Sequence, residues 1–298
     1  MTQFVDKGIL ALANVVEIDS NAWFQGHTGA ALLAGDSLVH SGALNDLAKR
    51  SLQERLAQFV DDNQHFMNPL AASPETTDYS KVVNAIELNA QQLCHSGHGV
   101  IYGALFLNAV TNNSVIVTER MVANIAKLII NCMDDNWGRY YGLADYRQYQ
   151  PTSLSNKGEI DIHQLCILAV TRSTQDLHHN TDEHFFSGDK LHGITHAHAI
   201  FLLDKLGYKE LAQQAAQQSL IQLELNDRKP ESGLKKVIPK PFDLSDPNIW
   251  GRDFNDDHQI KLAHSYVELS ININQPLAKL DNLWGATVWL NCLYTQST

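Results

Sequence analysis

Histidine is the residue type in this sequence whose number and placement most directly suggest chemistry. The chain of 298 residues contains 14 histidines. Imidazole is the commonest metal ligand in proteins and the usual proton carrier near neutral pH. Because the number alone does not show that these side chains are used, their positions on the predicted helices must decide.

The first two candidates lie on faces of predicted helices that carry small or apolar residues. His27 shares a face with Ala30 and Ala34, whose small side chains leave room for an imidazole to point inward. His98 falls on a face with Ile101 and Leu105. Taken singly, each is also consistent with a core histidine that is hydrogen-bonded to the backbone.

A third predicted helix carries three histidines that cannot all face one point. At about 100° per residue, His192 and His196 are neighbours, whereas His198 falls on a second face with Leu191 and Leu202. Because that second face is the apolar one, we expect His198 to be the ligand. We assign His192 a catalytic role, as a group that orients a ligand or moves a proton, with a ligand role as its alternative.

The fourth candidate opens a helix toward the end of the chain. His258 follows Asn255, Asp256 and Asp257, which offer N-cap residues, and Lys261 lies one turn later on the same side. We expect His258 and Lys261 to point together into a cavity, and we count Lys261 among the catalytic residues. The alternative for Lys261 is an ordinary i, i+4 surface pair with Asp257.

Separate helices that each bury one histidine indicate a shared site. Burying four imidazoles independently requires four hydrogen-bonding solutions, whereas one metal ion satisfies all of them. Histidine-rich coordination suits Fe, Zn, Cu or Ni. The four cysteines are scattered and form no CxxC pair, which argues against a structural zinc cluster and against a disulfide framework. A metal-free role of the histidines as general bases is the alternative.

These side chains must be positioned by helices. Apolar residues recur at helical spacing through most of the chain, and no segment shows sustained two-residue alternation. We predict an all-α fold, a single compact helical domain of residues 1–298 with inward-facing histidines from several helices. Residues 134–158 are aromatic and polar, and we predict that they form a loop region that walls a pocket. The main predicted helices cover residues 23–39, 45–60, 94–110, 115–132, 160–174, 191–207, 210–225, 256–270 and 276–294.

Composition argues against several classes of protein. The formal net charge of −11 disfavours a nucleic-acid-binding surface, which needs clustered Lys and Arg. No window approaches the roughly 18 uninterrupted apolar residues that a membrane span requires. The first residues do not resemble a secretory signal, and the cysteine usage fits a reducing compartment. We therefore expect a cytoplasmic protein.

Four short motifs around these histidines resemble motifs of the questin oxidase-like family. They stand in the family's order and span residues 21 to about 270. The first is similar to the family's early histidine-containing helix, and the others to its AHGLI, LHxVTxxHA and DxHxIK patterns. In this sequence the motifs read NAWFQGHTGAA (21–31), SGHGVI (96–101), LHGITHAHA (191–199) and DDHQIK (256–261).

The resemblance implies an all-helical, non-haem iron oxygenase that oxidises or opens the rings of aromatic polyketides such as anthraquinones. Lys261 is then a carboxylated lysine, which gains a carbamate oxygen donor and loses its positive charge beside the cation. The expected partners are O₂ and an aromatic small molecule, with NADPH as the candidate reductant and a homodimer as the candidate assembly. Carried over by position, the imidazole ligands are His27, His98, His258 and His198 (or His192). The candidate pocket walls are Tyr102, Trp137, Tyr141 and Trp250.

Two other classes of protein fit the same residues. A hydrolase or lyase, with zinc or without metal, would use a histidine together with Asp256 or Asp257. A non-catalytic helical binding protein would use the histidines only for packing. Metal content separates these classes from the oxygenase.

Overall fold

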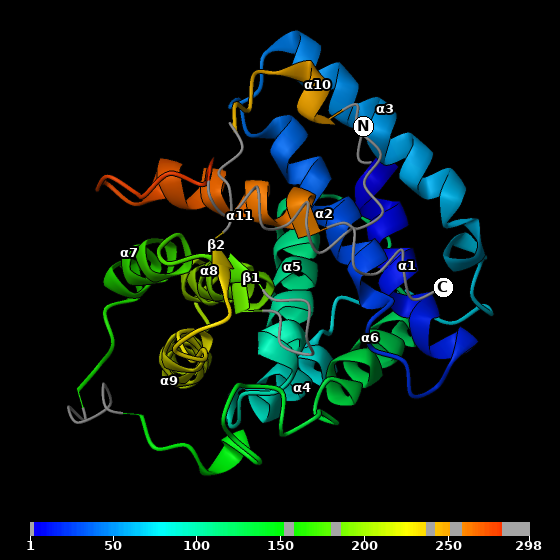
Figure 1. Ribbon diagram of the computed structural model, residues 1–298. Helices are drawn as coiled ribbons and strands as arrows, with labels where there is room; N and C mark the ends of the chain where they lie inside the picture. The colour runs from blue at the N-terminus through cyan, green and yellow to red at the C-terminus, as the bar shows by residue number, and fades with distance from the viewer. Residues whose placement is uncertain (1–2, 152–157, 180–185, 237–241, 251–257, 282–298) are drawn as a thin grey trace.

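The computed structural model describes residues 3–151, 158–179, 186–236, 242–250 and 258–281 (Figure 1). The described chain is almost entirely helical, so the predicted all-α fold is confirmed. Strand pairing within those ranges is limited to a two-residue antiparallel ladder between β1 (His178–His179) and β2 (Lys235–Lys236) and an isolated antiparallel bridge between Glu75 and Thr118. The α-helices are α1 (Gln3–Ile18), α2 (Gly26–His40), α3 (Asp46–Asp62), α4 (Ser80–Ala90), α5 (His98–Asn112), α6 (Glu119–Asn131), α7 (Ile162–Ser173), α8 (Phe186–Lys205), α9 (Lys209–Asn226), α10 (Pro247–Trp250) and α11 (His258–Asn272).

Four of these helices form a closed ring. α2 packs on α5, α5 on α8, α8 on α11, and α11 on α2. α5 stands near the centre of Figure 1, and the other three lie beside it. The remaining long helices cover this ring from outside: α1 packs on α2, α7 and α9 pack on α8, and α4 and α6 pack on α5.

The four ring helices run in the same direction. Their first turns carry ring contacts between His27, His98 and His258. Their last turns meet again around a cleft that is lined by His40, Asn112 and Lys205, among others. Neighbouring helices in simple bundles alternate in direction, so here the outer helices make the return passes. The shared direction places equivalent turns of four helices at one level.

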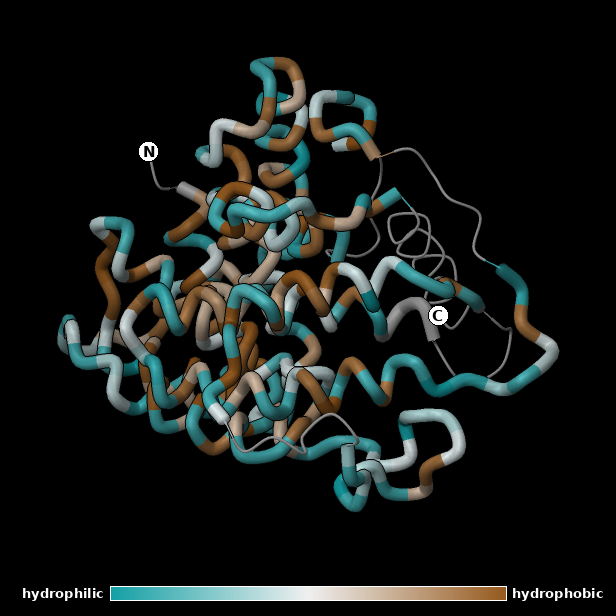
Figure 2. Tube along the Cα trace, turned by 90° about the vertical axis from the view of Figure 1, so that its left-hand side faces the viewer, coloured by the Kyte–Doolittle hydropathy of each residue, from teal (hydrophilic) through white to brown (hydrophobic). Residues whose placement is uncertain are grey.

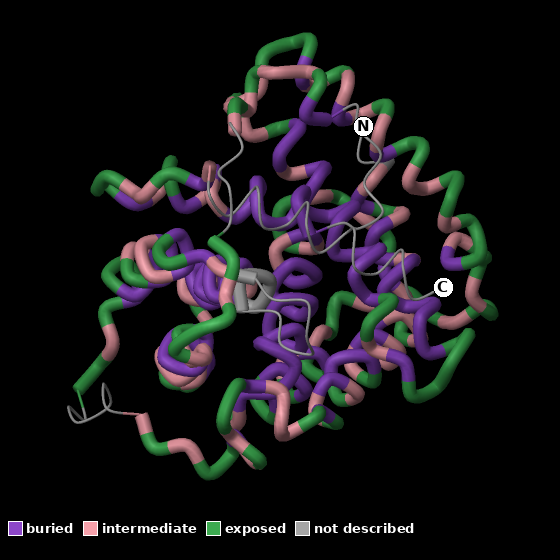
Figure 3. Tube along the Cα trace, viewed as in Figure 1, coloured by how far each residue is buried: buried purple, intermediate pink, exposed green. Residues whose placement is uncertain are grey.

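The ring helices are buried on nearly all sides. Figure 3 shows α5 and the described side chains of α8 as mostly buried, and every residue from 193 to 203 is buried. Most of the outer helices mix hydrophilic and hydrophobic residues, as the alternating colours of Figure 2 show. Helices that are apolar all round belong to the interior, whereas two-sided helices belong at the surface.

Close approach of the helices depends on small residues. A Cβ atom at Gly103 of α5 would lie 2.3 Å from a side-chain carbon of Ile86 on α4, and one at Gly29 of α2 would lie 2.6 Å from the carbonyl oxygen of Gly8 on α1. Larger residues at either position would push the helices apart. Gly207 lies in the turn that follows α8 and has φ +92°, a conformation that favours glycine.

Two predictions concern the later part of the chain. Trp250 is buried in a core cluster with residues of α2, α3 and α11, and its indole Nε1 donates to the carbonyl oxygen of Leu244 at 3.1 Å. It therefore belongs to the core and not to a pocket wall. Most of the predicted helix 276–294 lies outside the described residues. Within the described ranges, the helices are too short or too polar to cross a bilayer.

Candidate metal centre

Four histidines from the four ring helices meet at one point. Each offers one ring nitrogen, and these nitrogens all lie within 4.8 Å of one another. The Nε2 atoms of two of them, His27 and His98, are 2.6 Å apart. Two nitrogen lone pairs repel at this distance unless a proton or a cation lies between them, so the arrangement fits a shared cation. The four residues are His27, His98, His192 and His258.

The position of each histidine on its helix explains why the rings converge. His27 is the second residue of α2, and His98 and His258 are the first residues of α5 and α11. His192 is the seventh residue of α8. Helix N-termini carry partial positive charge. A point where they converge favours neutral imidazoles and an anionic ligand over additional bare cations.

The electrostatics favour the neutral form of His27, His98 and His192. Burial lowers the pKa of His27 and His98 well below the ordinary value, and the nearby Lys261 charge lowers both further. Burial, followed by the neighbouring His98 and His258, lowers the pKa of His192 in the same way. A neutral imidazole keeps one ring nitrogen free to bind a metal. These three imidazoles are thus in the protonation state that metal binding requires.

Lys261 lies at this centre, as predicted. It is one turn beyond His258 on α11, and only 4% of it is exposed. Its positive charge acts on His27, His98 and His192. A surface position for Lys261 disagrees with this burial, and Asp257, its predicted alternative partner, lies outside the described residues.

The structure places His198 outside the centre, which corrects the preference for His198 over His192. His198 lies six residues further along α8, where its ring contacts His264 at 4.9 Å between centroids and its Nδ1 lies 3.0 Å from Ser265 Oγ. The criterion of an apolar face failed because α8 is buried on both sides. His192 takes the position at the level of the other three rings, with centroids 4.7 Å from His98 and 5.2 Å from His258.

A strained turn directly before α5 sets the direction of His98. Three consecutive residues have positive φ: His95 (41°), Ser96 (55°) and Gly97 (85°). Each non-glycine residue in this conformation costs about 1–3 kcal/mol, and such strain persists only where surrounding contacts hold it. The turn lets the backbone carbonyl of His95 accept from His98 Nδ1, which directs Nε2 of His98 into the centre.

The contacts that hold this turn come from distant parts of the chain. Asp135 accepts the backbone N–H of His95 at 2.6 Å and also contacts the His95 ring, with Oδ1 3.0 Å from Nδ1. Tyr146 donates its hydroxyl to Asp135 at 2.6 Å, and Gln222 donates to the Ser96 carbonyl at 3.0 Å. Burial alone would raise the pKa of Asp135, but the hydrogen bond with His95 and the Arg139 charge lower it to about 2.

His196 supports the same turn from α8. Its Nδ1 is 2.8 Å from Gln222 Oε1, and its ring packs so closely on Gly97 that a Cβ atom there would lie 2.5 Å from it. Gly97 therefore serves two needs, a left-handed backbone and contact with His196. This explains why His196, although buried, is not one of the converging histidines.

Aromatic rings enclose the centre on one side. Trp23 stacks on His95 at 3.7 Å between centroids, and Phe24 contacts His27 at 4.4 Å. Tyr102 lies 5.6 Å from His98 and 6.0 Å from His27, as expected for a pocket wall. The predicted walls Trp137 and Tyr141 lie elsewhere: Trp137 packs on Tyr146, and Tyr141 is exposed.

Sequence reasoning missed the residues that support the centre. Trp23 and Phe24 lie inside the first motif, next to His27, and could have been found by asking which aromatic side chains share its first turn. His95 stands three residues before His98, a spacing that suggests a neighbour in the same turn. Asp135 had only a weak signal, as one of two acidic residues just after a predicted helix.

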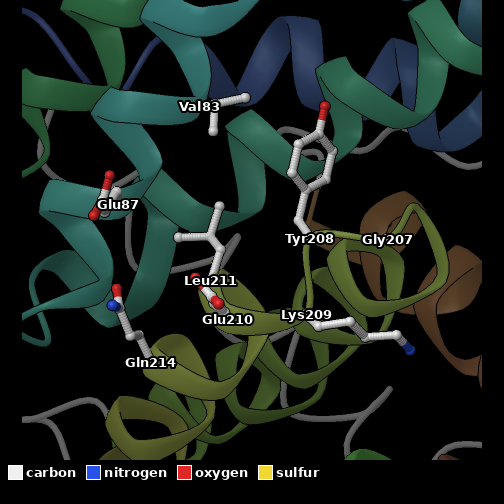
Figure 4. Close-up of a pocket in the computed structure, with 8 residues that line it drawn as sticks. All are labelled: Val83, Glu87, Gly207, Tyr208, Lys209, Glu210, Leu211 and Gln214. Atoms are coloured by element: carbon white, nitrogen blue, oxygen red, sulfur yellow. The ribbon is translucent and has the colours of Figure 1, made fainter.

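Surface clefts lie near the ring but share no residue with the four histidines. One of about 500 Å³ is lined by Tyr146, Arg147, Tyr149 and Gln150, among others, so the predicted loop region does wall a pocket. A second, of about 370 Å³, lies between α4 and the turn from α8 to α9 (Figure 4). Its lining side chains include Glu87 and Tyr208, and none of them contributes to the metal centre.

Comparisons of the chain with models of protein families, with curated proteins and with solved structures found no match. The likeness to the questin oxidase-like family therefore rests on the four motifs. What the geometry defines is a class of site, a group of four histidines, three of them buried, that can hold a metal ion.

Proposed function

We propose that this chain is a non-haem iron oxygenase that acts on an aromatic or quinone-type small molecule. The observation that carries the metal part is the convergence of four imidazoles from four helices, with ligand nitrogens within 4.8 Å of one another. Histidine-rich sites suit iron among other transition metals. The choice of iron and of the substrate class follows the resemblance of the four motifs.

The proposed ligands are His27, His98, His192 and His258. His192 replaces His198 because only His192 lies at the level of the other three. The carbonyl of His95 fixes the ring orientation of His98. Contacts of this kind beyond the ligands commonly change metal affinity by roughly 10–100-fold.

Lys261 is the proposed fifth donor, as a carbamate. The ammonium first loses one proton; the neutral Nζ then attacks CO₂, a C–N bond forms as one C–O π bond of CO₂ breaks, and a second proton leaves, so the side chain changes from a cation to an anion. This change suits the site because a bare ammonium would repel the metal, whereas an anion gains from the helix N-termini and from the cation. The burial of Lys261 beside three of the histidines supports this assignment.

The aromatic residues exclude water and offer flat surfaces. Trp23, Phe24 and Tyr102 contact the histidine rings directly, so an aromatic substrate that reaches the centre would stack against them. A dry site also strengthens the electrostatic interactions within it.

A bound iron ion would supply the redox chemistry by which O₂ reacts with an aromatic ring. Insertion of one oxygen atom, with release of the other as water, consumes two electrons and two protons. NADPH is the proposed source of the electrons. The protons must reach a site that is closed off from bulk water.

Metal analysis tests this proposal. We would measure metal content by mass spectrometry on untagged protein purified without chelator, beside His98→Ala and the control His65→Ala, whose side chain is exposed and outside the centre. Near-stoichiometric iron that is lost only in His98→Ala supports the proposal. The next assay is then oxygen consumption with a panel of quinones.

The other outcomes overturn it. Zinc bound in the same way would keep the site but indicate hydrolytic chemistry, for which Asp256 and Asp257, outside the described residues, are candidates. No metal in any of the proteins, even after anaerobic loading with Fe²⁺, would leave the histidines as packing or acid–base residues.

A further inference from the structure

α8 and α11 carry a second pair of histidines behind the metal centre. His192 faces His258 at 5.2 Å between centroids, and six residues later on both helices His198 faces His264 at 4.9 Å. Six residues of helix span about 9 Å. The two helices therefore advance side by side, and their facing sides can be followed from the centre inward.

These facing sides are polar and buried. We call them the α8–α11 seam, which consists of Thr195, His198, Lys261, His264 and Ser265. Each of the five is less than 5% exposed. Adjacent positions on the same helices, such as Ile194 and Leu262, are apolar. Burying polar groups costs free energy unless they find partners, so a polar seam in an apolar core calls for a reason.

The hydrogen bonds of the seam are incomplete. Ser265 Oγ lies 3.0 Å from His198 Nδ1. Among the described residues, Nε2 of His198 and both ring nitrogens of His264 have no hydrogen-bond partner. Both rings rest neutral because burial lowers their pKa values, that of His264 to about 4. Each neutral ring therefore has one N–H donor and one acceptor nitrogen. Of these four groups, only His198 Nδ1 has a hydrogen-bond partner among the described residues.

A cleft that contains charged groups lies further along the same two helices, where Glu268 follows Ser265 by three residues and Lys205 follows His198 by seven. This cleft of about 300 Å³ lies at the C-terminal ends of the ring helices, and its lining includes Asp36, Lys205 and Glu268. It also includes Leu33 and Leu105, which follow His27 and His98 by six and seven residues. Because the four helices run in one direction, these leucines lie near the level of His198 and His264. Lys205 at the cleft also acts electrostatically on His198.

We propose that the α8–α11 seam is a proton path from this cleft to the metal centre, in which His198 and His264, bridged by water molecules, pass the proton. Each ring accepts a proton on its free nitrogen while the proton on the other nitrogen leaves toward the centre, so no net charge stays on the ring. Thr195 occupies the turn of α8 between His198 and the ligand His192, and Lys261, the proposed fifth donor, occupies the corresponding turn of α11. The purpose of the path rests on the proposed oxygenase, which consumes protons, but its existence does not.

Exchange of the imidazole Cε1 hydrogen for deuterium tests the path on metal-free protein. This exchange is slow and depends on solvent access, and mass spectrometry reads it for each histidine. His264 is the only histidine in the tryptic peptide 262–279, whereas fragment ions separate the three histidines of peptide 191–205. His196 is the internal control, since it has the same exposure of 1% as His264 and its pKa is also lowered to about 4, but it bonds to Gln222.

We expect His264 to exchange at least about tenfold faster than His196, because the cleft admits solvent to the seam without opening of the core. Equal protection of the two rings would overturn the path. This result does not depend on metal or substrate, so it stands or falls separately from the oxygenase.

A variant then tests the use of the path. His264→Leu should retain iron at the wild-type level but lower the rate of oxygen consumption by about a hundredfold, the lower end of what positioned proton transfer commonly contributes. His163→Leu, on α7 and outside the seam, serves as the control. An unchanged rate in His264→Leu would overturn the role of the pair. Absence of iron from the wild type would overturn the proposed function and leave the exchange result intact.

Discussion

The metal centre and the His198–His264 pair are both built from histidines inside the ring of helices. α8 contributes to both, with His192 in the centre and His198 in the pair. At the centre, rings from all four ring helices converge at one level. Six residues further along, only α8 and α11 contribute imidazoles, and the other two helices present apolar residues such as Leu33 and Leu105. The centre is not the more buried of the two levels, so the number of helices that contribute a histidine decides which level can hold a metal.

The two levels also differ in what orients the rings. At the centre, His98 is directed by the strained turn before α5, which is held by Asp135 and Gln222. At the second level, the hydroxyl of Ser265 is the one hydrogen-bond partner found for the pair within the described residues. A ligand must be fixed in orientation, whereas a proton carrier must be able to exchange partners. The predictions below use this difference.

The largest expected effect is the gain in the free energy of unfolding on metal binding, which should depend on the histidines of the centre and not on the His198–His264 pair. At a metal concentration about 1,000 times Kd, binding adds about 4 kcal/mol to the free energy of unfolding. We expect this gain in the wild type and in His264→Leu, and expect it to vanish in His98→Ala. Urea unfolding with and without Fe²⁺ under anaerobic conditions measures it. A gain that survives in His98→Ala would place the metal somewhere else.

The second prediction concerns the strained turn. Asp135→Asn removes a buried charge that contacts His95, Arg139 and Tyr146, and should lower the free energy of unfolding by about 3 kcal/mol. It should also weaken metal binding by about 10–100-fold, because His98 loses its fixed orientation. Calorimetric metal titration of the folded variant measures the second effect.

Two variants serve as controls for this turn. Asp204→Asn, which breaks only a surface pair with Lys209, should change neither quantity measurably. Tyr146→Phe removes one hydrogen bond to Asp135 and should give a smaller effect in the same direction. Weakened stability with unchanged metal affinity in Asp135→Asn would show that the turn supports the fold without orienting His98.

Part of this architecture follows from the sequence, and the reason lies in local patterns. His27, His98 and His258 stand beside small or apolar residues at the starts of predicted helices, so their burial and their shared site could be inferred. The predicted helix 23–39 corresponds to α2 (Gly26–His40), and 210–225 to α9 (Lys209–Asn226). No helix was assigned before residue 23, where α1 lies.

The rest depends on contacts between distant segments. The choice between His192 and His198 depends on how far along the helix axes each residue lies relative to His27, His98 and His258. An apolar face does not give this position when the helix is buried on both sides. His192 is the second residue of the predicted helix 191–207 but the seventh of α8, so a rule based on first turns would also have misplaced it on the helix. Asp135 meets His95 across 40 residues of chain, and only the folded structure brings them together.

The third prediction uses pH. Burial lowers the pKa of His264 to about 4 from an ordinary value near 6.5. Between these values the unfolded chain binds a proton that the folded protein does not, so stability falls as the pH drops from about 6.5 to about 4 and is unaffected above that window. Each such histidine contributes a slope of about 1.4 kcal/mol per pH unit.

In metal-free protein, His264→Leu should reduce the slope of the free energy of unfolding against pH by the contribution of one histidine, about 1.4 kcal/mol per pH unit. Urea unfolding at several pH values between 4.5 and 7.5, chosen as about three units around the histidine range, measures this slope. His65→Leu, an exposed residue, should leave it unchanged. An unaltered slope in His264→Leu would mean that this ring is as easily protonated in the folded protein as in the unfolded chain.

The smallest expected effect compares two equally buried histidines of different roles. In His264→Leu, ring nitrogens without protein partners are replaced by an apolar side chain of similar size, so stability near pH 7 should stay constant or rise by up to about 1 kcal/mol. In His196→Leu, the buried Oε1 of Gln222 loses its partner, and stability should fall by about 1–3 kcal/mol. Urea unfolding followed by circular dichroism compares the two variants under one condition. A pair kept for proton transfer contributes little to stability. A larger loss of stability in His264→Leu than in His196→Leu would therefore contradict this role and show that the seam stabilises the fold.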